Sequence, residues 1–289
     1  LRSTDGVHFA HVRDKPVFTP EMAGSKHGSV QDPRVVKIDG TFYMSFAFRP
    51  YAWNSSPTGV GVPDSWQAEY PGFDGDERGN QTRSGVAVSR DGLRWEVAGW
   101  VNEENTDDRD VIVFPRKIGG RFAALRRPSG LVGTDTTRSG MPPRICISYS
   151  TDLSTWTNPQ VIMRPTFDWE DNRIGASTPP IRTKHGWLVL YHGVQNVRPA
   201  TRGVVYRLGA ALLHTDDPTR VVARCPHFLM EPQTYYERFG LYIPNVIFPT
   251  GAVVREGLLH LYYGVCDTAI ALATVPLGDL VEHVRQYAV

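Results

Sequence analysis

The sequence predicts an all-β fold made of repeated strand pairs. Four segments share one pattern, in which an apolar strand runs through a glycine-containing turn into an aromatic-rich strand; they are residues 32–46, 114–126, 180–192 and 251–264. Their turn glycines recur at intervals of roughly 65 to 80 residues and are Gly40, Gly120, Gly186 and Gly257. Glycine tolerates the backbone of a tight turn, so each copy is typical of two antiparallel strands.

A second motif alternates with the first. Ser, Asp and an aromatic residue recur together in residues 3–9, 89–95 and 150–156, and a looser copy covers residues 214–220. Each copy predicts a turn that leads into an outer strand, with the Asp in the turn and the aromatic side chain packed beside it. Strand pairs that alternate at a long period indicate small sheets repeated around an axis, so the expected architecture is a β-propeller.

Five blades are expected. Four copies and a closing half at residues 269–275 predict a five-bladed β-propeller whose last blade is built from both chain ends. Leu1 falls inside a copy of the turn motif, so we expect an inner hairpin upstream that this sequence lacks. Helical periodicity is weak and is best at residues 277–287. The 27 glycines and 22 prolines suit many tight turns rather than long helices.

Composition restricts the classes of function. The chain of 289 residues suffices for one large catalytic β-domain spanning residues 1–289. A net charge of +1 and the lack of a long apolar run argue against binding to nucleic acid or a membrane. Three widely spaced cysteines form no metal-binding pair and are typical of free thiols in a reducing compartment, so we expect a cytoplasmic protein. The sequence leaves the oligomeric state open, with a homo-oligomer as one alternative.

Polar residues stand at equivalent ends of the predicted hairpins. They are Asp32 and Arg34, Asp110 and Arg127, Arg173 and His192, and Asp267. Because the inner strands of a propeller converge on its axis, these side chains are predicted to share one funnel. Simpler interpretations exist for single residues. Asp32 would cap a turn, and His192 would be an ordinary core histidine. Arg173 would pair with Glu170 or Asp171.

The balance of charge in this set favours phosphate as a reactant. Inverting hydrolysis of a glycoside uses two carboxylates about 6.5 to 9.5 Å apart, one as acid and one as base. Here one carboxylate, Asp110, is grouped with Arg127, Arg173 and His192. Inorganic phosphate is already an anion and needs no base, but it needs cationic donors to hold it, which arginine supplies well. The set therefore predicts phosphorolysis, with inorganic phosphate as co-substrate and no metal or other cofactor.

Several segments resemble glycoside hydrolase family 130. They are residues 110–115, 125–128, 172–181, 186–194, 206–213, 244–249 and 266–268. The resemblance covers about residues 32–280. It implies a five-bladed propeller and, for most members, inverting phosphorolysis of β-mannosides that releases α-mannose 1-phosphate. A minority of the family are hydrolases.

The resemblance also implies roles for individual residues. Asp110 corresponds to the general acid, whose proton is thought to pass through the 3-hydroxyl of the mannose. The implied phosphate-binding residues are Arg127, His192, Arg173, which replaces a lysine common among phosphorylases, and, by a looser alignment, Arg144. We expect the sugar to be bound by Asp32, Arg34, Asp267 and Tyr242.

Three other functions are weighed against this one. A hydrolase of the same family would use a glutamate as base, and Glu170, Glu231 and Glu237 are available. An arabinanase-like hydrolase would use Asp32 as base but needs a further inner-strand carboxylate as acid. A sugar-binding propeller without chemistry gives no reason to place Asp110 among cations. Residues 51–83 look like an insertion that either walls the acceptor side of the site or forms a surface loop.

Overall fold

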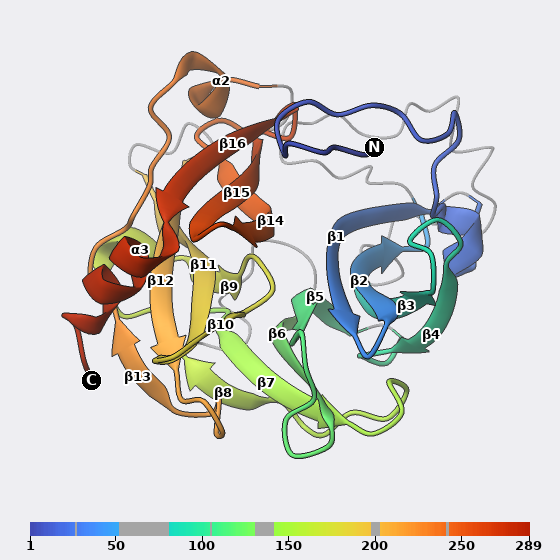
Figure 1. The fold of residues 1–289 in the computed structure, drawn as a ribbon, viewed down its shortest axis with the longest axis horizontal. Coiled ribbons are helices and arrows are strands. Elements are labelled where there is room, and N and C mark those ends of the chain that lie inside the picture. Colours follow the sequence, from blue (N-terminus) through green and yellow to red (C-terminus); the bar gives the residue numbers. More distant parts are fainter. Residues whose placement is uncertain (27, 52–80, 105, 131–141, 198–202, 241–242) are drawn as a thin grey trace.

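The computed structural model describes residues 1–26, 28–51, 81–104, 106–130, 142–197, 203–240 and 243–289. Within these ranges four antiparallel sheets are arranged around a common centre, as in a β-propeller (Figure 1). The first two sheets contain β1 (Ser29–Ile38), β2 (Thr41–Arg49), β3 (Arg83–Ser89) and β4 (Glu96–Trp100), then β5 (Asp107–Val113), β6 (Phe122–Gly130), β7 (Ile145–Ser150) and β8 (Gln160–Met163). The third contains β9 (Arg173–Ala176), β10 (Ile181–Thr183), β11 (Gly186–Asn196), β12 (Val204–Leu213) and β13 (Val221–Arg224). The fourth contains β14 (Ile247–Arg255), β15 (Leu258–Val265) and β16 (Ala269–Pro276).

Helices are short and flank the sheets. They are η1 (Pro20–Ala23), η3 (Asp168–Glu170), α2 (Tyr235–Arg238) and α3 (Leu277–Arg285). The last of them lies in the window with the best helical periodicity and buries Leu280, Val281 and Val284. No helix within the described ranges has the length and apolar character needed to cross a bilayer.

The four predicted hairpins are confirmed. They are the pairs β1–β2, β5–β6, β10–β11 and β14–β15. All four turn glycines have positive φ, with values of 83° for Gly40, 78° for Gly120, 128° for Gly186 and 79° for Gly257. This region of backbone space is open to glycine at little steric cost, which explains why glycine recurs at each turn.

The aspartate turns are confirmed as well. Asp91 Oδ1 accepts hydrogen bonds from the backbone N–H groups of Leu93 and Arg94, each 2.8 Å long, and the turn leads from β3 into the outer strand β4. Asp152 forms the same turn between β7 and β8. The looser copy leads from β12 into β13. The side chain thus replaces backbone partners that the turn cannot supply.

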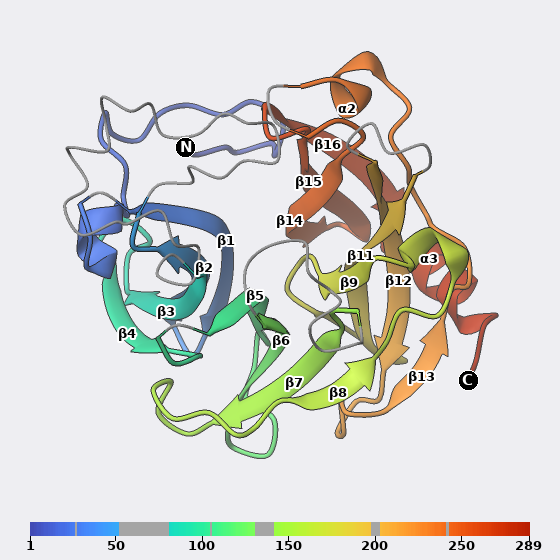
Figure 2. The same cartoon turned by 180° about the vertical axis from the view of Figure 1, so that it is seen from behind.

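The expected count of five blades is wrong for the described residues, which form four sheets. β16 was expected to close a fifth blade, yet it pairs with β15 along its length as the third strand of the fourth sheet. The N-terminal copy of the turn motif forms its aspartate turn, but its described strand pairing is limited to the isolated Arg2–Ala10 bridge. This segment lies between the first and fourth sheets in both views (Figure 1 and Figure 2). A blade requires several paired strands, and a single bridge does not provide them.

Apolar clusters join neighbouring sheets and fix the inner strands. One cluster packs the first sheet on the second, another packs the second on the third, and a further one packs the third on the fourth and on α3. In the second of these, the Phe114 and Trp187 rings meet edge to face at 5.2 Å. Each buried side chain of this size stabilises the fold by about 1.5–3 kcal/mol. The second and third sheets are therefore held by apolar cores on both sides.

Candidate active site

Two inner strands carry an aspartate at a β-bulge. The pairing of β1 with β2, and that of β5 with β6, each shifts register beside an aspartate. Asp32 and Asp110 have left-handed φ values of 54° and 52° there. Asp tolerates this region better than most residues, and a bulge re-aims a side chain that the alternation of a strand would point elsewhere. The bulge explains how Asp110 leaves the pattern of β5 and reaches the centre.

Asp110 meets side chains from three other strands. Its Oδ2 atom lies 2.7 Å from Nε of Arg127 on β6 and 3.4 Å from Nε2 of His192 on β11. Its Oδ1 atom lies 3.9 Å from Nη2 of Arg34 on β1. All four side chains are buried, with Asp110 3% and His192 1% exposed. The structure thus brings together residues that are far apart in the sequence, as the hairpin alignment predicted.

The surrounding cations determine the charge of Asp110. Burial alone would raise the pKa of this carboxyl, but its interactions with Arg127 first, and then with His192, Arg34 and Arg109, lower it below its ordinary value. Asp110 is therefore an ionised carboxylate near neutral pH. A residue that acts as a general acid must acquire a proton before it can donate one.

His192 is a neutral imidazole. Burial lowers its pKa to about 3 against the opposing charge of Asp110, and the charges of Arg127, Arg173 and Arg34 also lower it. The expectation that His192 adds a third cation beside Asp110 is therefore wrong in this arrangement. The cations around the carboxylate are arginines, because guanidinium keeps its charge in places where imidazole loses it.

Ser177 orients both His192 and Arg34. Its Oγ atom lies 3.2 Å from Nδ1 of His192, and its carbonyl oxygen accepts a 3.1 Å hydrogen bond from Nε of Arg34. Because the carboxylate of Asp110 lies nearest to Nε2, the favoured neutral tautomer carries its proton on Nε2 and accepts the serine hydroxyl proton at Nδ1. Ser177 therefore fixes which imidazole nitrogen faces the acid.

Gly175 allows the close approach of Asp110 and His192. It lies on β9, which pairs with β11 so that Gly175 is opposite His192. A Cβ atom at Gly175 would lie 2.0 Å from Oδ2 of Asp110 and 2.7 Å from Nε2 of His192. Any side chain there would force the acid and the imidazole apart. The requirement for glycine is one of space, because its φ is not positive.

Arg173 comes from the same short strand and is oriented by neutral groups. It donates hydrogen bonds to Oδ1 of Asn172 and to the hydroxyl of Tyr206 on β12. Its guanidinium also lies over the Tyr206 ring, 5.3 Å from the centroid. The simpler interpretation of an ion pair with Asp171 is not seen, because Asp171 accepts from the backbone of Asn196 at 2.8 Å. The charge of Arg173 thus has no carboxylate to offset it in these contacts.

The remaining predicted residues lie in different surroundings. Asp32 accepts a 2.7 Å hydrogen bond from Nη1 of Arg34 through its backbone oxygen. The pKa of Asp267 is raised by burial and by the charge of Asp32, which places these two carboxyls near each other. Arg144 is half-buried just before β7, and its phosphate-binding role stays a prediction. Tyr242 and residues 52–80, which include most of the expected insertion, lie outside the described residues.

The three glutamates considered as a hydrolytic base have other partners. Glu170 is fully buried in an ion pair with Nη2 of Arg224. It packs near Gly193, which alternates with His192 on β11 and so faces away from Asp110. Glu231 pairs with Nε of Arg207 at 3.1 Å.

Glu237 stabilises the start of α2. Its Oε2 atom accepts hydrogen bonds from the N–H groups of Gln233 at 2.9 Å and Thr234 at 2.8 Å, and its Oε1 atom accepts one from the Tyr263 hydroxyl at 2.9 Å. Such a reciprocal capping arrangement is structural. The three glutamates are therefore engaged in contacts other than the group formed by Asp110, Arg127 and His192.

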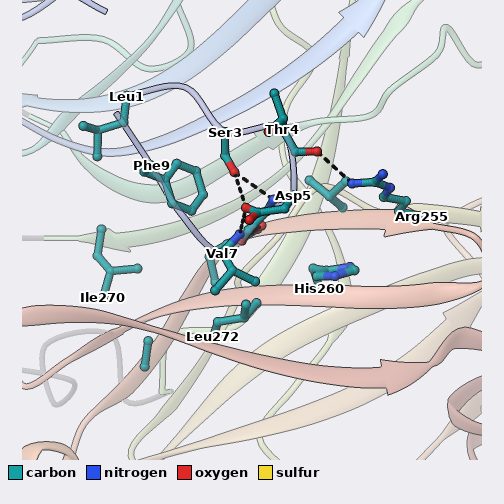
Figure 3. A pocket seen from close by; sticks show the side chains of 14 residues that line it. Leu1, Ser3, Thr4, Asp5, Val7, Phe9, Arg255, His260, Ile270 and Leu272 are labelled. Atoms are coloured by element: carbon teal, nitrogen blue, oxygen red, sulfur yellow. Dashed lines mark hydrogen bonds between the residues drawn. The ribbon is translucent and has the colours of Figure 1, made fainter. Parts of the chain in front are cut away.

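A separate hollow of about 630 Å³ lies between the N-terminal segment and the fourth sheet (Figure 3). Apolar side chains such as Leu1, Phe9 and Ile270 line it. Its carboxylate, Asp5, is used within its own turn, where it accepts hydrogen bonds from Ser3 Oγ at 2.9 Å and from nearby backbone N–H groups. This hollow offers apolar contact but none of the groups gathered around Asp110.

Sequence reasoning missed Gly175, Ser177 and Tyr206 as site residues. All three fall inside segments that carry the family resemblance, which was the available signal. Their functions depend on contacts across strands β9, β11 and β12, and such contacts cannot be read from a single strand. A glycine inside a strand was the clearest local cue, because it often marks a close approach.

Comparisons with known proteins identify a family for the chain. Residues 76–286 match the family model of glycoside hydrolase family 130, described as beta-1,4-mannooligosaccharide phosphorylase. The chain is 35% identical over 279 residues to a 1,2-beta-oligomannan phosphorylase of Thermoanaerobacter sp. (strain X514), covering 96% of this chain and 78% of the relative. It is 30% identical over 294 residues to a beta-1,4-mannooligosaccharide phosphorylase of Ruminococcus albus, covering 99% of this chain and 75% of the relative.

Solved structures show the same likeness. A beta-1,2-mannobiose phosphorylase from Listeria innocua, determined with beta-1,2-mannobiose, superimposes with a TM-score of 0.74 at 27% identity. The superposition covers 99% of this chain and 68% of that one. Fold and sequence therefore indicate the same family.

Proposed function

The chain belongs to glycoside hydrolase family 130, and we propose that it is an inverting β-mannoside phosphorylase. It cleaves a terminal β-mannosyl residue with inorganic phosphate and releases α-mannose 1-phosphate and a shortened sugar. Relatives named for β-1,2 and for β-1,4 linkages are similar to the chain at 35% and 30% identity, which supports β-mannosides as the substrate class.

The observation that supports phosphorolysis most strongly is the buried ion pair of Asp110 with Arg127. Asp110 lies 2.7 Å from Arg127 and 3.9 Å from Arg34, while Glu170 and Glu231 are paired with arginines elsewhere. A hydrolase needs a second carboxylate to activate water, whereas phosphate needs only cationic donors. The charge balance around Asp110 therefore suits an anionic nucleophile.

The proposed mechanism assigns one task to each group. Arg127 and Arg173 hold the phosphate and offset its charge, since guanidinium binds two oxygens of an anion at once. His192, oriented by Ser177, donates a neutral hydrogen bond and adds no repulsive charge. Phosphate attacks the anomeric carbon from the face opposite the leaving sugar, which inverts the configuration. Asp110 supplies the proton of the leaving oxygen, by way of the mannose 3-hydroxyl.

In this proposal the mannose is bound by charged residues at the strand ends. Asp32, Arg34 and Asp267 bind mannose hydroxyls, and the raised pKa of Asp267 suits a group that exchanges hydrogen bonds with a sugar. Tyr242 keeps the same assignment as a prediction. One catalytic domain, a cytoplasmic location, and inorganic phosphate as co-substrate without a cofactor also stay predictions.

The test is a substrate panel incubated with and without inorganic phosphate. We expect β-1,2- or β-1,4-mannobiose to yield α-mannose 1-phosphate only when phosphate is present, and the accepted isomer identifies the linkage. Release of free mannose at the same rate in both incubations would instead identify a hydrolase. The anomeric configuration of the mannose 1-phosphate, which cannot mutarotate, is read by NMR and tests inversion separately.

A further inference from the structure

The proposed acid and a proposed phosphate-binding arginine are partners in one buried ion pair. Nε of Arg127 lies 2.7 Å from Oδ2 of Asp110, and the two side chains are 8% and 2% exposed. Arg34 adds a second guanidinium at 3.9 Å from the other oxygen of the carboxylate. Because these side chains are shielded from water, the protonation state of the carboxylate depends strongly on the charge of the arginines beside it. An anion that takes up Arg127 therefore changes the environment of Asp110 directly.

This contact creates a conflict that the reaction must resolve. An acid that gives a proton to a leaving sugar has to carry that proton when the glycosidic bond breaks. The arginines hold Asp110 in its ionised form, with a pKa below the ordinary value. Phosphate between Arg127 and Arg173 adds negative charge beside the carboxylate and offsets the cations. Like charges at close range favour protonation of one partner.

We propose that phosphate binds together with the proton that Asp110 later donates, so that nucleophile binding loads the acid. The proposal rests on the proposed phosphorylase function and deepens it. Asp110 is thus a carboxylate between turnovers and a carboxylic acid only while phosphate is bound. The source of the proton is the phosphate or, where phosphate is already the dianion, the solvent.

The step balances in atoms and charge. Dihydrogen phosphate gives one proton to the Asp110 carboxylate and becomes hydrogen phosphate, the nucleophile. A phosphate oxygen forms a bond to the anomeric carbon as the glycosidic C–O bond breaks, and its electron pair leaves on the sugar oxygen. That oxygen receives the proton of Asp110, directly or through the relay. Mannose 1-phosphate monoanion and the shortened sugar result, and Asp110 is again a carboxylate, the form that serves as base in the reverse reaction.

Other charged groups face the same carboxylate and define the alternative. Arg34 from β1, Arg109 from β5 and Arg127 from β6 act on Asp110, and His192 from β11 touches it. Arginine does not titrate in this range, so among the described residues that contact Asp110, His192 is the one that could take up a proton instead when the anion binds. Phosphate binding that protonates His192 instead would contradict the proposal.

The experiment is isothermal titration of the whole chain with inorganic phosphate at about pH 8, in buffers of different ionisation enthalpy. Free phosphate is then mostly the dianion, so binding should take up about one proton per phosphate from the buffer. The Asp110→Asn variant should bind phosphate with no uptake. Asn tolerates the left-handed backbone at this position, so the variant should fold.

Asp108→Asn is the matched control, because Asp108 is an equally buried acid that pairs with Arg126 in the same hairpin. Asp108→Asn should take up the same number of protons on phosphate binding as the unmodified protein. The affinity for phosphate should also fall about tenfold per pH unit above neutrality in the unmodified protein, and not in Asp110→Asn.

Absence of uptake in the unmodified protein, or its persistence in Asp110→Asn, would overturn the proposal. If mannose 1-phosphate is still formed in a phosphate-dependent way, only this inference fails and the function stands. Activity that does not depend on phosphate would remove the function itself.

Discussion

Oδ2 of Asp110 and Nε of Arg127 lie 2.7 Å apart on the adjoining strands β5 and β6. The proposed acid and a proposed phosphate ligand are therefore a single ion pair. Removing one partner of such a buried pair leaves the charge of the other without compensation. Variants at either position should therefore change both phosphate binding and catalysis. Through this contact, the binding of phosphate by Arg127 and the protonation state of Asp110 influence each other.

Replacing Asp110 by Asn should lower the turnover of an unactivated β-mannoside by roughly 100-fold or more, the scale of a lost positioned acid. The fold should persist, because Asn also tolerates positive φ. Steady-state kinetics and thermal unfolding of the same preparation check both points. A folded variant with near-full turnover would rule out Asp110 as the acid.

Gly175→Ala should damage the site without removing any functional group. The added Cβ would lie 2.0 Å from Oδ2 of Asp110, so the acid must shift, and we expect turnover to fall by about tenfold or more. Overpacking should also reduce the free energy of unfolding by about 1–3 kcal/mol. Gly278→Ala in α3 is the control, because its Cβ meets nothing within 4 Å. Equal activity of the two variants would contradict the close-approach argument.

Arg173→Ala should raise KM for phosphate far more than KM for the sugar. Loss of a charge-assisted contact with the anion costs on the order of 2 kcal/mol, or about 30-fold in affinity. The KM of Arg173→Lys for phosphate should lie between those of Arg173→Ala and the unmodified protein. Lysine keeps the charge but loses the planar guanidinium that donates to Asn172 and Tyr206. Arg182→Ala, at an exposed position on β10, is the control. Equal effects on both KM values would mean that Arg173 does not discriminate the anion.

His192 should make the protein sensitive to acid. Its pKa falls from about 6.5 in an unfolded chain to about 3 in the fold. The folded state therefore binds fewer protons, and the stabilisation present above about pH 6.5 is lost as pH falls toward 3, on the order of 4 kcal/mol in all.

Urea unfolding between about pH 6.5 and 3 should show that the free energy of unfolding falls less with decreasing pH in His192→Gln than in the unmodified protein. Burial raises the pKa values of Asp108 and Glu170 to about 7, so these groups stabilise the fold as pH falls, opposite to His192. Both groups are present in the two proteins, so their contribution cancels in the comparison. His11→Gln, at an exposed position, should leave the slope unchanged. Parallel pH curves for His192→Gln and the unmodified protein would show that His192 does not titrate in this way.

The strand pairs and the meeting of Asp110, Arg127 and His192 could be predicted from the sequence. Glycine turns repeat visibly, and inner strands of a propeller converge, so equivalent hairpin ends must lie near one another. The bulge at Asp110 could not be predicted, because a register shift depends on the pairing partner. The number of blades was wrong for a related reason, since β16 could pair with β15 or close another sheet.

Charge states were also hidden from the sequence. His192 was expected to be cationic, but burial and neighbouring arginines keep it neutral. Glu170 was a candidate base until its pairing with Arg224 placed it on the far side of β11. Both outcomes depend on three-dimensional burial, which sets the pKa of a group more strongly than its neighbours in sequence do.

The central claim is that phosphate, and not water, cleaves the β-mannoside. The most direct measurement is the initial rate of cleavage of the accepted β-mannobiose as phosphate is varied from zero, with the products quantified by phosphorus NMR. The account predicts a rate that extrapolates to the buffer blank without phosphate and one α-mannose 1-phosphate for each bond cleaved. A rate that does not change with phosphate, with free mannose as the product, would contradict it.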